Sequence, residues 1–385
     1  MRILFAPSQY SGMLTAGQVA DAMADGWSRQ APGDVVMCAP LSAGEAGFAS
    51  VVEAAVGGVS VGVTVADPLG RDVPATVLLA EVGGVRTGFV EAAQAAGLHL
   101  LDAADRDPCV TSTFGVGQMI EVAVAEGASR VVVACGGTGT NDAGAGMLAA
   151  LGAGQGPALC SGGGALGQIS PDDVAGLEAV RDRLIGVELV VAAEGSLPLL
   201  GFSGASATTA PEKGASVEQT QELERSLGHF VDVVERVLPS GLDLLTGLPR
   251  RVTRVPGAGA GGGLGYGLVV LGARVEDAVS HVMGLWSMRE LLGEHDLVVT
   301  GERCFDGRSV HAGVVVSVAA AAAEFALPTM VLAGQVEVGR RESMSAGVAA
   351  VYGIVDRGGD MASVMADPAS AIADRAQRLA RTWSR

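Results

Sequence analysis

The chain has 385 residues, of which 49% are hydrophobic and 17% charged, and its net charge is −17 at pH 7. The hydrophobic content excludes general disorder, and the length predicts two domains. The negative charge argues against nucleic acid and anionic membranes as partners, since phosphate groups require a basic face. No apolar run reaches the roughly 20 residues of a membrane span. The chain start leads directly into a folded pattern, which predicts a cytoplasmic protein.

The first 60 residues alternate strand, helix and strand. Apolar runs predict strands over 2–6 and 35–39, and apolar residues at helical spacing predict a helix over 15–29. This order is typical of a parallel sheet, in which ligands bind beyond the carboxyl ends of the strands. The loops 7–12 and 41–48 are therefore expected to face a site.

The middle of the chain has a different pattern. Short strands with turns over 59–65, 75–80 and 86–91 indicate an antiparallel insert. Parallel-type strands return at 296–300 and 328–333, with a helix over 313–325 between them and a closing helix over 368–382. We therefore expect one α/β domain built from both chain ends, with a second α/β domain inserted between them.

The most distinctive stretch is 135–147, which follows a predicted strand over 130–134. Its glycines allow a tight turn and a close approach to a ligand, and its Thr, Asn and Asp residues bring polar groups to a helix N-terminus. The pattern predicts a phosphate or polyol site, or else only a helix cap. It matches neither GxxxxGK[ST] nor the GxGxxG dinucleotide motif.

Isolated residues add to this prediction. Lys213 is the only lysine in the chain, and it is interpreted either as a ligand-binding residue or as a surface charge. Glu302 and Asp306 follow a parallel strand at its carboxyl end, where magnesium ligands are often found. The five cysteines are scattered without CxxC spacing, which indicates neither a disulfide framework nor a zinc site.

Taken together, these motifs resemble the glycerate kinase family, the bacterial type that transfers a phosphoryl group from ATP to glycerate. The resemblance covers nearly the whole chain, and its best matches are the segments 113–118, 136–147, 198–201, 211–214, 257–265, 300–302 and 306–307. It implies a Rossmann-like parallel-sheet domain of residues 1–60 plus 290–385, an inserted α/β domain of residues 61–289, and a cleft between them. It also implies ATP and Mg²⁺ as cofactors, a small glycerate-like substrate and a homodimer.

The resemblance assigns roles to residues of this chain. The implied catalytic residues are Asp142, Lys213 and Asp306, and the implied metal ligands are Glu302 and Asp306. The implied cofactor-binding residues are Gly136, Gly137, Thr138, Thr140, Asn141, Gly261, Gly262 and Gly263.

Five positions depart from the family pattern at residues that carry charge there. Ser11 and Gly313 stand where the family has lysines, and carboxylates are replaced at Ser8, Ala43 and Ser196. Because phosphoryl transfer depends on such charges, three hypotheses stay open: a glycerate kinase, a kinase with altered substrate, and a non-catalytic module that binds a metabolite or a partner. Arg303, Arg308 and His311 are candidates to replace the missing charges, and Glu45 stands one place before the family's glutamate.

Overall fold

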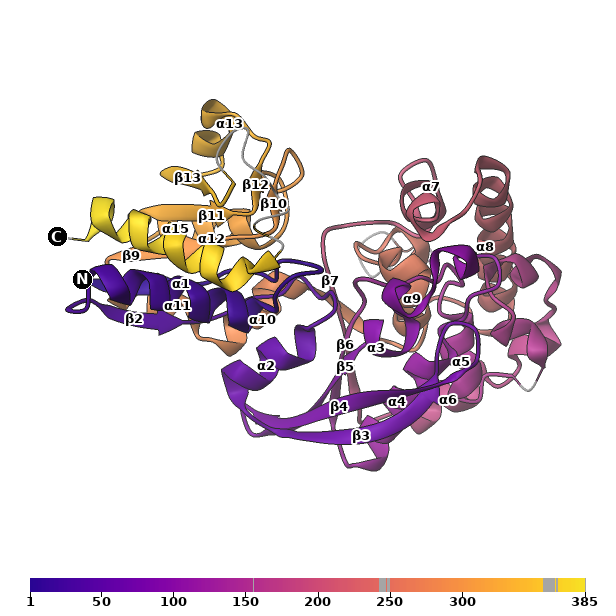
Figure 1. The fold of residues 1–385 in the computed structure, drawn as a ribbon. Coiled ribbons are helices and arrows are strands. Elements are labelled where there is room, and N and C mark those ends of the chain that lie inside the picture. Colours follow the sequence, from indigo (N-terminus) through magenta and orange to yellow (C-terminus); the bar gives the residue numbers. More distant parts are fainter. Residues whose placement is uncertain (155, 242–246, 248–249, 356–363, 365, 385) are drawn as a thin grey trace. The chain divides into compact units, whose positions relative to one another are not determined.

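The computed structural model describes residues 1–154, 156–241, 247, 250–355, 364 and 366–384. The predicted α/β class is confirmed, since helices alternate with strands that are mostly paired in parallel (Figure 1). The chain divides into two compact units: residues 1–43, 50–57 and 278–385 form the first, and residues 44–49 and 58–277 form the second. Among the described helices, none combines the length and the hydropathy that a bilayer span requires.

The first unit is built on a parallel five-stranded sheet of order β13-β11-β9-β1-β2. Its strands are β1 (Arg2–Phe5), β2 (Val35–Cys38), β9 (Leu297–Thr300), β11 (Thr329–Ala333) and β13 (Ala350–Gly353). A separate parallel pair joins β10 (Cys304–Phe305) and β12 (Gln335–Val336). The helices are α1 (Ala16–Gln30), most of α2 (Phe48–Val56), α10 (Ala278–Leu285), α11 (Met288–Glu294), α12 (Val314–Ala323), α13 (Arg340–Ser345) and α15 (Pro368–Trp383).

Helices α1 and α15 lie side by side in the first unit (Figure 1). A capping box of Thr15 and Gln18 begins α1. Gly26 lets the two helices approach closely, because a β-carbon there would lie 1.9 Å from the carbonyl oxygen of Ala373. Trp27 is fully buried against Phe5, with ring centroids 6.0 Å apart. The core of this unit therefore joins the start and the end of the chain.

The second unit holds a six-stranded sheet of order β3-β4-β5-β6-β7-β8. The first three strands pair antiparallel, as expected for the insert, and β5 to β8 pair in parallel. The strands are β3 (Val59–Ala66), β4 (Asp72–Val82), β5 (Val85–Glu91), β6 (Arg130–Ala134), β7 (Glu188–Ala193) and β8 (Arg274–Asp277). The α-helices are α3 (Ala93–Ala96), α4 (Phe114–Ala125), α5 (Ala145–Ala150), α6 (Leu177–Arg183), α7 (Ala205–Thr209), α8 (Val217–Val237) and α9 (Ala260–Val270).

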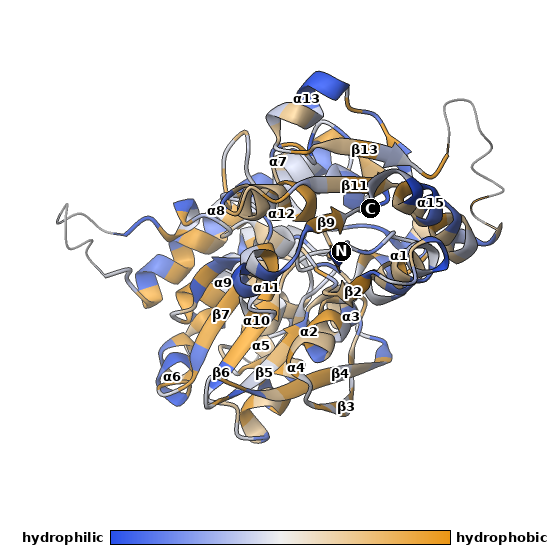
Figure 2. Ribbon diagram, turned by 90° about the vertical axis from the view of Figure 1, so that its left-hand side faces the viewer, coloured by the Kyte–Doolittle hydropathy of each residue, from blue (hydrophilic) through white to orange (hydrophobic). Residues whose placement is uncertain are grey.

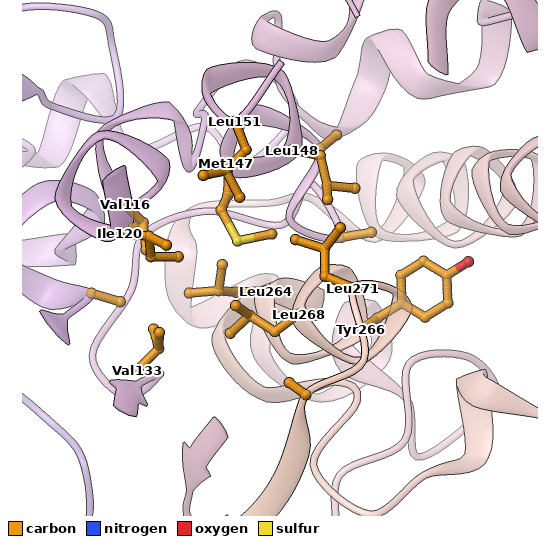
Figure 3. Close-up of a cluster of buried hydrophobic side chains, with 14 of the residues drawn as sticks. Val116, Ile120, Val133, Met147, Leu148, Leu151, Leu264, Tyr266, Leu268 and Leu271 are labelled. Atoms are coloured by element: carbon orange, nitrogen blue, oxygen red, sulfur yellow. The ribbon is translucent and has the colours of Figure 1, made fainter. Parts of the chain in front are cut away.

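The core of the second unit lies between its sheet and the helices α4, α5 and α9. Met147, Leu264 and Leu268 are fully buried there and point toward one another (Figure 3). The hydropathy colouring of Figure 2 shows β6 and β7 as hydrophobic strands, and the apolar residues of both are buried throughout. Because β6 is buried, its carboxyl end can hold the polar glycine-rich loop that follows at a fixed place.

Candidate functional site

The glycine-rich loop 135–144 lies between β6 and α5 in the second unit. Thr140, Asn141 and Asp142 are fully buried, and Thr138 is 5% exposed. Backbone bonds fix the loop on one side, because the N–H of Gly139 donates to the carbonyl of Ala96 over 2.8 Å and the N–H of Leu98 donates to the carbonyl of Gly137 over 3.0 Å. The polar residues predicted to bind a ligand are therefore held in a rigid, solvent-shielded turn.

Asp142 organises this turn from within. Its carboxylate accepts four hydrogen bonds: from the N–H and the hydroxyl of Thr113 and from the N–H groups of Gly144 and Gly146, over 2.8–3.1 Å. Burial raises the pKa of the Asp142 carboxyl above its usual range, although these hydrogen bonds oppose that effect. The arrangement favours the helix-cap alternative for Asp142, and a catalytic role for it stays a prediction.

The second glycine run packs against the first. Gly262 has a φ of +70°, and a β-carbon on it would lie 2.0 Å from the carbonyl oxygen of Thr140. Gly261 and Gly263 likewise approach the backbone at Cys135 and Ala143. The lack of side chains at these glycines lets the two loops pack closely. That packing explains the glycines without a ligand, so their binding of a cofactor stays a prediction.

Lys213 lies inside the second unit, in the short turn Pro211–Lys213. The residue is only 6% exposed, and its Nζ donates a hydrogen bond of 2.7 Å to the carbonyl oxygen of Thr140. Burial lowers the pKa of the ammonium from 10.5 to about 8, although the charges of Asp142 and Glu212 act in the opposite direction. The sole lysine of the chain is thus aimed at the glycine-rich loop, and it is not a surface charge.

Three buried side-chain oxygen atoms of the loop have no hydrogen-bond partner among the described residues. They are Thr138 Oγ1, Thr140 Oγ1 and Asn141 Oδ1. The amide nitrogen of Asn141 does have a partner, since it donates to the hydroxyl of Ser206 on α7 over 3.0 Å. Buried polar groups without partners cost free energy, and a bound ligand is one way to satisfy them. Hydroxyls and an ammonium suit an oxyanion, and the amide oxygen suits a donor such as an alcohol.

A second segment, residues 44–49, which leads into α2, meets the glycine-rich loop. The N–H of Gly136 donates to the carbonyl of Gly44 over 2.9 Å, and a β-carbon at Gly137 would lie 4.0 Å from Cβ of Glu45. The buried carboxylate of Glu91, at the end of β5, accepts from the N–H groups of Gly47 and Ala49 over 3.0 Å each. Sequence reasoning missed Glu91, because a single glutamate at a strand end has no distinguishing pattern.

Glu302 and Asp306 lie in the first unit, after β9. The Asp306 Oδ1 accepts hydrogen bonds from the N–H groups of Arg308 and Ser309 over 2.7 and 3.3 Å, and the Arg308 guanidinium lies 3.6 Å from Oδ2. The backbone N–H of Arg308 lowers the pKa of Asp306 below its usual range, so this carboxylate is ionised at neutral pH. Mg²⁺ accepts one or two carboxylates when phosphates supply its other ligands, and the ionised Asp306 carboxylate suits that requirement. Within the described ranges, no three acidic, His or Cys side chains gather into a metal-binding group.

Comparisons with a family model, with curated proteins and with solved structures all find glycerate kinases. The model of the Glycerate kinase family matches residues 3–384. The glycerate kinase of Bacillus subtilis is 34% identical over 360 residues, which cover 92% of this chain and 90% of that protein. The glycerate 2-kinase of Escherichia coli is 35% identical over 339 residues, covering 87% of this chain and 85% of that protein. A crystal structure of glycerate kinase 2 from Salmonella typhimurium superposes with a TM-score of 0.78 at 30% identity, covering 99% of this chain and 98% of that one.

Proposed function

The chain belongs to the glycerate kinase family, and on that premise we propose that it transfers the γ-phosphoryl group of ATP to a hydroxyl of glycerate or a related small hydroxy acid. In this reaction the acceptor hydroxyl oxygen forms a bond to the γ-phosphorus, the bond from that phosphorus to the ADP oxygen breaks, and the hydroxyl proton passes to a base or to water. Mg²⁺ would neutralise charge on the phosphates, and Glu302 and Asp306 are the residues proposed to hold it.

The observation that carries the proposal is the position of Lys213 beside the glycine-rich loop. An ammonium buried without a paired carboxylate contact is costly, and in this chain it donates to the carbonyl of Thr140 next to three unpartnered polar atoms. An oxyanion of a substrate would satisfy the ammonium and the threonine hydroxyls together. We propose Lys213, Thr138, Thr140 and Asn141 as substrate-binding residues and Asp142 as the residue that fixes their loop.

The alternative is a non-catalytic member of the family that binds a metabolite or a partner. The observation in its favour is the set of uncharged residues at Ser8, Ser11, Ala43, Ser196 and Gly313, where the family has charged ones. Ser8 is 7% exposed and its hydroxyl donates to the carbonyl of Gly301 over 3.2 Å, so it supplies no charge. A homodimer and a cytoplasmic location also stay predictions.

Isothermal titration with a non-hydrolysable ATP analogue, with and without Mg²⁺, separates these alternatives when it is combined with an ADP-release assay on D-glycerate. Magnesium-dependent binding together with ADP release that requires the hydroxy acid supports the kinase. Binding without turnover supports the non-catalytic alternative. The variant Lys213→Met is expected to lose turnover in the first case, and unchanged turnover in that variant would contradict the proposed site.

A further inference from the structure

Arg106 is a cationic side chain to which the described part of the chain offers no partner, and its backbone lies next to the turn of Lys213. Its Nε is buried and has no hydrogen-bond partner, and among the described residues its guanidinium forms no hydrogen bond and no ion pair. A partly buried guanidinium has been removed from part of its water shell, and five N–H donors of fixed geometry need acceptors there. The chain has a net charge of −17, so carboxylates are abundant, and a partly buried arginine that pairs with none of the described ones is unusual.

The carboxylates beside Arg106 in the chain are occupied elsewhere. Asp105 Oδ2 lies 3.6 Å from the guanidinium of Arg71. Asp107 Oδ1 accepts from the N–H of Cys109 over 2.9 Å and from the amide of Gln219 over 3.3 Å. The local sequence offers acceptors, and the fold directs them away from Arg106.

The backbone places the segment 106–111 against both parts of the proposed site: Arg106 contacts the turn of Lys213, and Thr111 contacts the glycine-rich loop. Gly214, the residue after Lys213, has a φ of +102° and packs so closely that a β-carbon on it would lie 2.1 Å from the carbonyl oxygen of Arg106. Five residues after Arg106, the hydroxyl of Thr111 donates to the carbonyl of Gly139 in the glycine-rich loop over 2.9 Å. The segment that begins at Arg106 thus runs from Lys213 to the loop that Lys213 contacts.

We infer that Arg106 is the second cationic binding residue of this site and that, with Lys213, it binds an oxyanion of a substrate, either the carboxylate of the hydroxy acid or a phosphoryl group of the nucleotide. The inference rests on the proposed function. A guanidinium suits this task because two parallel N–H groups match two oxygens of a carboxylate or a phosphoryl group. An ammonium such as Lys213 supplies a point charge from a second direction.

Two probes distinguish the sources of the oxyanion. D-glycerate presents a carboxylate without phosphate, and inorganic tripolyphosphate presents phosphoryl groups without a hydroxy acid. Isothermal titration of each probe is carried out with the wild-type chain, Arg106→Gln, Arg106→Lys and the control Arg181→Gln. Arg181 is an exposed arginine of α6, so its substitution makes the same change in net charge outside the site.

Arg106→Gln is expected to weaken the binding of one probe by about 10- to 100-fold, the loss typical of a hydrogen bond to a charged group. Arg106→Lys keeps the charge and loses the two-pronged geometry, so it is expected to restore only part of that affinity. Arg181→Gln is expected to bind both probes as the wild type does. Weaker glycerate binding identifies the carboxylate, and weaker tripolyphosphate binding identifies the phosphoryl group.

The melting temperature without ligand tests whether Arg106 is merely structural. Because its guanidinium has no partner to lose among the described residues, Arg106→Gln is expected to melt within about 2 °C of the wild type. A fall of more than about 5 °C would assign the residue to the fold and overturn the inference. Equal binding of both probes by Arg106→Gln and the wild type would overturn it while leaving the proposed function standing. A wild-type chain that binds neither probe would overturn both.

Discussion

At the scale of single residues, the chemistry of Lys213 gives a pH dependence that is open to measurement. Burial holds the pKa of its ammonium at about 8, and only the protonated form attracts an oxyanion. We expect the affinity for D-glycerate to fall above about pH 8, by about tenfold for each pH unit at most. In the same window, from about 8 to 10.5, the unfolded chain binds more protons at this lysine, so its contribution to stability rises with pH.

Lys213→Arg is the matched control for this pH profile. An arginine stays protonated throughout the range, so titration of glycerate into this variant is expected to give an affinity that changes little from about pH 7 to 10. A wild-type profile as flat as that of the variant would show that another group binds the oxyanion. The carboxylate of glycerate does not titrate in this range, so any decline belongs to the protein.

Asp142 supports a prediction about stability. Both of its carboxylate oxygens accept hydrogen bonds from N–H groups. In Asp142→Asn the NH₂ group that replaces one oxygen must therefore face an N–H group. We expect urea unfolding to show a loss of about 1–3 kcal/mol, even though the substitution removes a buried charge. Asp173→Asn, at a half-exposed position that accepts from the backbone N–H and the hydroxyl of Ser170, is expected to change stability by less than about 0.5 kcal/mol. A stabilised Asp142→Asn variant would mean that the charge outweighs the hydrogen bonds.

At the scale of elements, the contact between the two glycine-rich loops predicts opposite outcomes for two glycine substitutions. Gly262→Ala places a methyl group 2.0 Å from the carbonyl oxygen of Thr140 at a φ of +70°, so we expect it to destabilise the chain by about 2 kcal/mol or more. Gly228 lies within α8, and a β-carbon on it would have no atom of another segment within 4 Å. Gly228→Ala is therefore expected to be neutral or to stabilise the chain by up to about 1 kcal/mol. Thermal unfolding of both variants checks the pair, and equal melting temperatures would contradict the packing described here.

Periodic elements were the part of the fold that the sequence predicted well. The strand expected over 130–134 is β6 (Arg130–Ala134), and the helix expected over 15–29 is α1 (Ala16–Gln30). The sequence did not predict α2 or the edge strand β8, since short elements of mixed polarity have no clear period. Glycine runs were also ambiguous, because the sequence does not distinguish a glycine that approaches a ligand from one that approaches another backbone segment, as Gly262 does.

The site was predictable only in part, for physical reasons. The loop 135–147 and Lys213 stood out by composition, and the structure brings them within one hydrogen bond of each other. Arg106 and Glu91 did not stand out, because their importance depends on which partners the fold gives or denies them. The unpartnered guanidinium of Arg106 is visible only once Asp105 and Asp107 are seen to be engaged elsewhere.

At the scale of the whole molecule, each unit has its own sheet and its own hydrophobic core. The three tryptophans, Trp27, Trp286 and Trp383, all belong to the first unit, whereas the glycine-rich loop and Lys213 belong to the second. Tryptophan fluorescence therefore reports on the first unit alone, and circular dichroism reports on both units. We expect the two signals to give denaturation curves that do not coincide, because separate cores need not unfold together.

A ligand of the second unit sharpens this prediction. Bound tripolyphosphate should stabilise the unit that holds Lys213 by mass action. It should shift the circular dichroism transition and leave the fluorescence transition nearly in place. Curves that coincide and that shift together on ligand addition would show that the chain unfolds as one cooperative unit.

Because the chain has a single lysine and that lysine is buried, proteolysis at lysine can report on one place in the fold. An endoproteinase that cleaves only after lysine has one target bond, between Lys213 and Gly214, and it yields the fragments 1–213 and 214–385. That bond is accessible only when the turn around Lys213 opens, since its side chain is 6% exposed. The rate of this one cut therefore measures how often the proposed site opens, and a ligand that closes the site would be recorded as the survival of a single band on a gel.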